Sequence, residues 1–328
     1  MNRRFVAVVC ALALGTSAVS GCSPQQETQP QTTPRVPEPV PVVIGTLPTE
    51  DMLPLWVAEQ ESLFAEYGLD SVEIVTFQAV QERDAAFAAG EINAFAGDII
   101  AAAQLETGST PVTIATVMLG ATPAEGRFGV VAAPDSGYTD IVALAGVPVA
   151  TSVNTIEEYV FDGLMRQAGV PAGDVAIEVV ATASTRYDLL MRGELKAAVL
   201  PEPLLSLAES EGSTLLADDT TGENLSQTVL VFSDEYLSEI GGVDTMAALL
   251  KVWDAGVEIV NADPDAWRSL LVEQARVPEP IKDTYRINAY PTAQIPTSAQ
   301  IDAVIDWMRE KGTLQREITY EDLVLVTP

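Results

Sequence analysis

Histidine is absent from all 328 residues, and cysteine occurs only twice, at Cys10 and Cys22. Without histidine the chain has no Ser-His-Asp arrangement, no imidazole general base and no histidine-containing zinc site. The glycine patterns of dinucleotide-binding turns and P-loops are missing as well. We therefore expect that the protein is not an enzyme and binds no cofactor or metal. Catalysis by a pair of carboxylates stays possible, because the chain has 47 acidic residues.

Basic residues are scarce, with 17 Lys and Arg against 47 Asp and Glu, which gives a formal net charge of −30. Such an acidic chain repels phosphate backbones and anionic lipid headgroups. Nucleic acid is therefore not an expected partner. The net charge does not reveal the sign of a ligand in a sheltered cleft, because local groups decide there.

The first 21 residues have the pattern of a secretory signal peptide, with two arginines before an apolar run over residues 5–19. The run is shorter than the about 20 residues that a membrane-spanning helix needs. Its end, Val19-Ser20-Gly21-Cys22, resembles the bacterial lipobox, in which the cysteine carries a diacylglyceryl group. The alternative is an ordinary signal peptide with an incidental cysteine. We expect an exported chain, anchored by lipid on Cys22 to the outer face of the cytoplasmic membrane.

Residues 22–41 are expected to be the lipidated cysteine and a disordered spacer, because they are rich in Pro, Gln, Thr and Glu without apolar periodicity. Cys10 would leave with the signal peptide, so the mature chain has no disulfide and relies on its hydrophobic core. No later apolar stretch approaches membrane length. The remainder is expected to be a soluble monomer.

From Val42 onward short apolar strands alternate with amphipathic helices, which predicts an α/β fold with mostly parallel sheets. The expected strands are residues 42–44, 72–77, 92–96, 112–118, 129–132, 147–150, 176–180, 197–200 and 228–232. The expected helices are residues 55–67, 81–89, 99–106, 156–167, 185–191, 244–262, 264–274 and 298–311.

An internal repeat is visible because residues 89–94 (AGEINA) match residues 192–197 (RGELKA), each closing a helix and opening a strand. Two similar α/β units in one chain imply two lobes. We expect lobe one to comprise residues 42–122 plus 230–328, with the C-terminal helices packed on it. Lobe two would comprise residues 123–229, with two crossing segments between the lobes.

Ligands of open α/β sheets bind at the carboxyl ends of strands, where strand order reverses. This rule selects four loops, residues 46–51, 97–98, 151–155 and 201–203, two from each lobe. The candidate substrate-binding residues are Thr49, Glu50, Asp51, Gly97, Asp98, Met118, Ser152, Asn154, Thr155 and Glu202.

Each candidate also has a structural interpretation. Residues 151–155 present hydroxyls, an amide and free N–H groups, which favour an anionic group of a ligand. Their structural interpretation is a plain N-cap of the following helix. Asp98 could accept a hydrogen bond from ligand or cap its own helix. Glu50 and Asp51 could be solvated loop acids. Glu202 lies between two prolines, which favours a positioned side chain.

Several stretches of the chain resemble ABC-transporter substrate-binding proteins of the nitrate, sulfonate and taurine group, which includes binders of the thiamine pyrimidine precursor. The matching stretches are Leu53–Glu59, Leu63–Leu69, Ala88–Ala94, Leu144–Gly146, Asn154–Tyr159 and Ala198–Leu204. The resemblance implies the type 2 periplasmic binding protein fold. It also implies that the two lobes close on a small solute, which is delivered to a membrane permease driven by a partner ATPase.

The substrate stays open at this point. Sulfonate or nitrate binders are expected to place polar donors, sometimes basic groups, around the anion, and the four loops contain no Arg or Lys. A sulfonate-, nitrate- or taurine-like anion and a thiamine-precursor-like heterocycle are both compatible. The alternatives are a ligand-sensing lipoprotein for a membrane kinase and an enzyme like the thiamine pyrimidine synthases. Export and the missing histidine count against the enzyme.

Overall fold

The computed structural model describes residues 41–325, which lie in one compact unit. The expected signal peptide, Cys22 and all but the last residue of the expected spacer lie outside the described residues. Within the described part, no helix combines the length and apolar character that crossing a bilayer requires.

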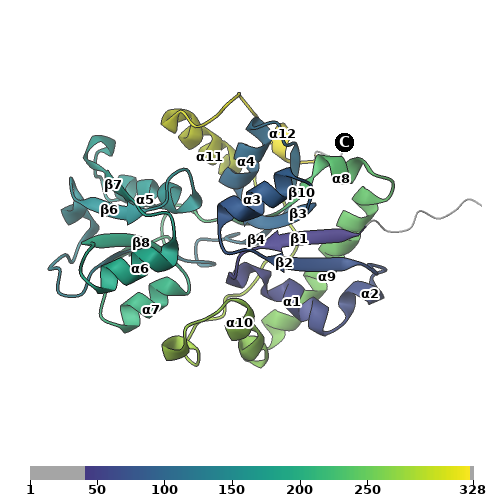
Figure 1. The fold of residues 1–328 in the computed structure, drawn as a ribbon, viewed down its shortest axis with the longest axis horizontal. Coiled ribbons are helices and arrows are strands. Elements are labelled where there is room, and N and C mark those ends of the chain that lie inside the picture. Colours follow the sequence, from purple (N-terminus) through teal and green to yellow (C-terminus); the bar gives the residue numbers. More distant parts are fainter. Residues whose placement is uncertain (1–40, 326–328) are drawn as a thin grey trace, which may run out of the picture. The chain divides into compact units, whose positions relative to one another are not determined.

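The first sheet has the strand order β2-β1-β3-β10-β4 (Figure 1). Strand β1 is parallel to β2 and β3, whereas β10 runs antiparallel between β3 and β4. Strand β10 comes from far downstream and so returns the chain to this sheet. With two parallel and two antiparallel pairs, the sheet is mixed and not, as predicted, mostly parallel. Its strands are β1 (Val42–Thr46), β2 (Val72–Thr76), β3 (Ala94–Asp98), β4 (Val112–Leu119) and β10 (Thr228–Ser233).

The second sheet repeats this plan with the order β7-β6-β8-β5-β9. Strand β6 is parallel to β7 and β8, and β5 runs antiparallel between β8 and β9. The sequence repeat therefore corresponds to a repeat of topology. The strands are β5 (Phe128–Ala132), β6 (Pro148–Thr151), β7 (Ala176–Val179), β8 (Ala197–Pro201) and β9 (Thr214–Asp218), of which β9 is not predicted from the sequence.

Helices flank both sheets (Figure 1). The predicted helix over residues 55–67 is wrong as one element, because Ser62 has a φ of 62° and its left-handed backbone separates two helices. The α-helices are α1 (Leu53–Gln60), α2 (Leu63–Glu66), α3 (Val80–Ala88), α4 (Ile99–Thr107), α5 (Ile156–Gln167), α6 (Ala183–Met191), α7 (Leu204–Ser210), α8 (Asp234–Ser238), α9 (Gly242–Ala262), α10 (Arg268–Gln274), α11 (Ser298–Lys311) and α12 (Tyr320–Leu323).

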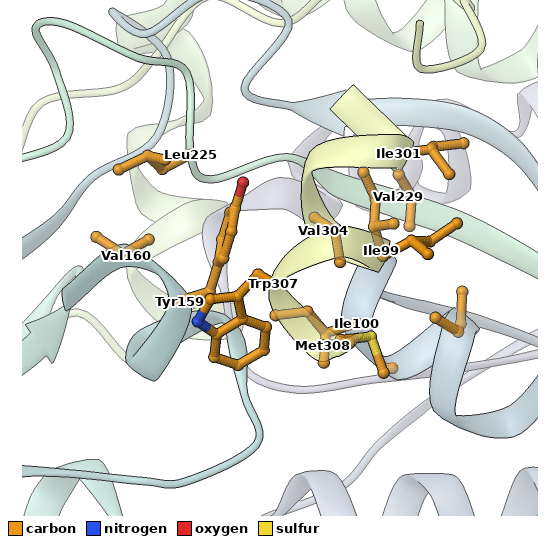
Figure 2. Packing of buried hydrophobic residues seen from close by; sticks show 14 of the residues in the cluster. Ile99, Ile100, Tyr159, Val160, Leu225, Val229, Ile301, Val304, Trp307 and Met308 are labelled. Carbon is orange, nitrogen blue, oxygen red and sulfur yellow. The ribbon is translucent and has the colours of Figure 1, made fainter. Parts of the chain in front are cut away.

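Helix α11 joins a helix of the first sheet to a helix of the second (Figure 2). Its apolar side chains share one buried cluster with Ile99 and Ile100 of α4. Toward α5, the ring of Trp307 meets Tyr159 edge-on at 5.4 Å between centroids, and its indole N–H donates to Asp162 at 2.9 Å. Helix α11 therefore packs against one helix from each sheet.

The two segments that connect the sheets run side by side at Gly120 and Ser226. The side-chain amide of Asn224 donates to the carbonyl oxygen of Gly120 at 2.6 Å. Gly120 has a φ of 83°, and a Cβ added there would lie 2.4 Å from the carbonyl oxygen of Ser226. Only glycine allows this backbone contact between the connections.

Candidate functional site

A cavity of about 440 Å³ lies where strands of both sheets end. Its walls come from the loops after β1, β3, β6 and β8, as the strand-end rule predicts. The starts of α3 and α6 also line it, at residues 78–81 with Arg83 and at residues 181–184. Equivalent elements of the two repeated units thus surround one space.

Eight of the ten candidate residues are part of the cavity lining, namely Thr49, Asp51, Gly97, Asp98, Ser152, Asn154, Thr155 and Glu202. Met118 instead points into the apolar core from β4 and is fully buried. Glu50 is buried among other residues outside the lining. The structure brings the eight together, and their contact with a ligand stays a prediction.

Glu50 is a buried carboxyl with its own hydrogen-bond shell. The hydroxyl of Tyr285 donates to one carboxyl oxygen at 2.9 Å, and the side-chain amide of Asn288 donates to the other at 3.1 Å. Burial, followed by the nearby charge of Glu202, raises the pKa of Glu50 from 4.5 to about 8. A pKa of about 8 favours the protonated form of this carboxyl at neutral pH.

Replacement of Glu50 by glutamine is expected to stabilise the protein at alkaline pH. Because its pKa is raised on folding, the folded state holds a proton that the unfolded state releases between pH 4.5 and about 8, so stability falls as the pH rises through this window. Glu50→Gln removes that loss, for a gain of about 5 kcal/mol at pH 9 and little change at pH 4. Denaturant unfolding at both pH values measures it, and an equal effect at both would contradict the raised pKa.

Sequence reasoning missed the cavity's arginine Arg83, which α3 holds almost fully buried. Its guanidinium donates to the Ala96 carbonyl oxygen at 2.7 Å and lies 4.6 Å from the centre of the Phe95 ring. Arg186 of α6 does the same in the second unit, donating to the Val199 carbonyl oxygen at 2.9 Å. Each arginine lies 13 residues before its acceptor, so extending the sequence repeat toward the N-terminus would have paired them.

Other lining residues also lie outside the four predicted loops. Arg276 follows α10, and its guanidinium donates to the side-chain oxygen of Gln78 at 2.6 Å. Phe128 begins β5, Thr228 begins β10, and Gln104 of α4 donates to the Asn154 carbonyl oxygen at 2.7 Å. Two arginines thus reach the cavity although the loops contain none. No local pattern singles out Phe128 or Arg276 in the sequence.

The chain's own carboxylates occupy several helix starts at the cavity. Asp98 caps α4 by accepting from the Ala101 N–H at 2.8 Å, which confirms its structural interpretation. Glu202 accepts from the N–H of Ser206 in α7 at 3.1 Å. At α5 the N-cap expected from residues 151–155 makes no side-chain hydrogen bond to the helix backbone, and Glu158 accepts from the Asn154 N–H at 2.6 Å.

Solved structures of known proteins share this fold at low identity. The aliphatic sulphonate binding protein SsuA from Escherichia coli is 16% identical, with a TM-score of 0.73 over 89% of this chain and 93% of that one. The nitrate-binding protein NrtA from Synechocystis PCC 6803 is 15% identical, with a TM-score of 0.67 over 88% and 85%. The desulfurization enzyme DszB is 13% identical, with a TM-score of 0.67 over 87% and 96%.

These likenesses establish the periplasmic binding protein fold, on which both binding proteins and an enzyme occur. No curated protein matches the sequence. The family model of the NMT1-like proteins matches residues 35–253, about two thirds of the chain. The chain therefore belongs to the NMT1-like family.

Proposed function

We propose that this protein is the substrate-binding component of an ABC importer, which captures a small polar solute and delivers it to a permease and its ATPase. The observation that supports it most is the cavity at the strand ends of both sheets, lined by residues of both repeated units. Its volume lies in the range of about 300–1,000 Å³ found for small-molecule sites. The likeness to sulphonate- and nitrate-binding proteins supports the same role.

In this proposal the protein is a monomer of two lobes, residues 42–122 plus 230–328 and residues 123–229, which close on the solute. The connecting segments at Gly120 and Ser226 would serve as the joint. Contacts across the lobes already surround the cavity, such as Gln104 of α4 with Asn154. A solute between the lobes would add contacts to both and favour the closed form.

Thermal unfolding of residues 37–328 with candidate solutes tests this proposal. The panel contains sulfonates, nitrate, amino acids, thiamine precursors and flavins. A solute at 100 times its dissociation constant should add about 2.7 kcal/mol of stability. Recovery of the solute unchanged supports a binding protein, whereas its conversion would favour an enzyme, as the likeness to DszB allows. No stabilisation by any member would contradict the proposal.

The proposal places the protein outside the cytoplasm, held near its permease by lipid on Cys22. Two or three acyl chains would make the tether stable, because a single chain gives only marginal membrane binding. The spacer that follows Cys22 would let the folded part stand off the membrane surface.

Cys22→Ala is expected to release the protein from the membrane fraction without loss of solute binding. The substitution removes the only thiol that remains after signal cleavage and leaves residues 37–328 unchanged. Fractionation of cells and a binding assay on both fractions measure it, with Ser23→Ala as the control that keeps the anchor. A Cys22→Ala protein that stays in the membrane would contradict lipid anchoring.

A further inference from the structure

Acidic side chains outnumber basic ones in the lining of the cavity. Among the described residues of the lining, the acids are Asp51, Asp98, Glu157 and Glu202, and the bases are Arg83 and Arg276. The lining includes no lysine. The acids come from both sheets, since Asp51 and Asp98 follow β1 and β3 whereas Glu157 and Glu202 follow β6 and β8.

The guanidinium groups nearest these acids are already engaged. Arg83 donates from Nε and Nη2 to Asp84 at 2.9 and 2.7 Å, and from Nη1 to a carbonyl oxygen. Arg127 lies 3.2 Å from Glu202 but also contacts Glu209 at 2.8 Å and Asp218 at 2.9 Å. Glu157 is paired with Arg186, and Arg127 faces three carboxylates at once. Arg83 is paired with Asp84 and Arg276 donates to Gln78, so among the described residues Asp51 and Asp98 line the cavity without an ion pair of their own.

Backbone N–H groups do not supply the missing positive charge. The starts of α4 and α7, where an anion would find free donors, each hold a carboxylate of the chain. No side chain caps α5, but its first turn carries Glu157 and Glu158, whose charges disfavour an anion there. The start of α6 differs, because its first turn contains no acidic residue. An anionic group of a zwitterionic ligand fits at α6, and a purely anionic ligand would meet the acids elsewhere in the cavity.

Asp51 and Asp98 approach the same strand. Thr228 of β10 lies opposite Asp98 in the antiparallel ladder and also faces Asp51, whose carboxylate it helps to stabilise. Burial is the largest influence on the pKa of Asp51, Asp98 and Glu202, and it raises all three. A positive charge placed among these three carboxyl groups would favour their ionised forms. It would thereby offset the cost of burying them as carboxylates.

We propose that the solute bound in this cavity presents a positively charged group, such as a protonated amine or a guanidinium, to Asp51, Asp98 and Glu202. This inference rests on the proposed function and names the class of solute. The lining around these acids is largely apolar, with side chains such as Leu47, Phe128 and Ile156. The body of the solute would pack there while its cationic group meets the acids.

Titration calorimetry of residues 37–328 with matched small solutes tests the charge. Ethanolamine, choline and agmatine are the cations, taurine is the zwitterion, and nitrate, ethanesulfonate and isethionate are the anions. We expect binding of at least one of the three cations or of the zwitterion taurine. Asp51→Asn and Glu202→Gln should each weaken that binding at least tenfold, because the amides keep the shape and remove the charge. Asp302→Asn, an exposed acid on α11, is the matched control and should leave it unchanged.

The outcomes separate this inference from the proposed function. Binding of anions alone, abolished when the cavity is filled by Ala183→Trp, would keep the proposed function and overturn the inference. Binding of taurine that survives both acid substitutions would overturn it as well. Absence of binding by every member would overturn the positive charge assigned to the solute. The proposed binding function would then be tested separately, by the thermal-unfolding panel described above.

Discussion

Replacing Arg186 by methionine is expected to destabilise the fold by about 3–5 kcal/mol, the usual cost of breaking a buried ion pair from one side. The Arg186 side chain is fully buried, and its guanidinium donates to Glu157 and to the carbonyl oxygens of Val180, Ala181 and Val199. Methionine fills a similar volume but satisfies none of these acceptors. Denaturant unfolding at pH 7 measures the loss.

Arg192→Met is the matched control, because Arg192 follows the last turn of the same helix and pairs with exposed Glu194. We expect no measurable change in this variant. A loss below about 1 kcal/mol in Arg186→Met would fall in the range of exposed pairs and contradict the structural role assigned to Arg186.

Ala183→Trp is expected to abolish solute binding, with a loss of at least 100-fold, or about 2.7 kcal/mol. Ala183 is the first residue of α6 and lines the cavity, so an indole there would occupy the space of the solute. Its side chain is only half-buried and is not part of the apolar core, so the fold should tolerate the change. Titration calorimetry with the best solute of the panel measures the affinity.

Ala172→Trp provides the control for this variant, since Ala172 is exposed and lies outside the lining. Its affinity should equal that of the unchanged protein. If Ala183→Trp bound the solute as tightly as Ala172→Trp while both unfolded at the same temperature, the solute would not bind in this cavity.

The sequence was sufficient for the parts of the site that follow strands. A strand end is marked locally, by an apolar run and the polar residues after it, and parallel strands bring such loops together. This is why Asp51, Asp98 and Glu202 were predicted as neighbours although they are far apart in the chain. The helix over 298–311 was predicted with the observed bounds because its caps, Thr297 and Gly312, are local signals too.

The features that were missed depend on contacts distant in sequence. Arg83 lies on a helix surface, where a charged residue is ordinarily solvated, and its burial comes from Phe95 and the Ala96 carbonyl oxygen. Strand β9 forms only against β5, more than 80 residues earlier in the chain. Glu50 was predicted as a ligand contact, and tyrosine and asparagine side chains from residues 285–290 enclose it instead. Contacts of this kind, between residues far apart in the chain, leave no recognisable pattern in the sequence near either residue.

The crystal structure of residues 37–328 with the best-binding solute of the charge-matched panel tests the central claim most directly. We predict one solute between the two sheets, with its positively charged group within hydrogen-bonding distance of Asp51, Asp98 or Glu202. Solute bound only on the outer surface would contradict the binding role of the cavity. Solute bound in the cavity with an anionic group against these carboxylates would contradict the charge assigned to the ligand.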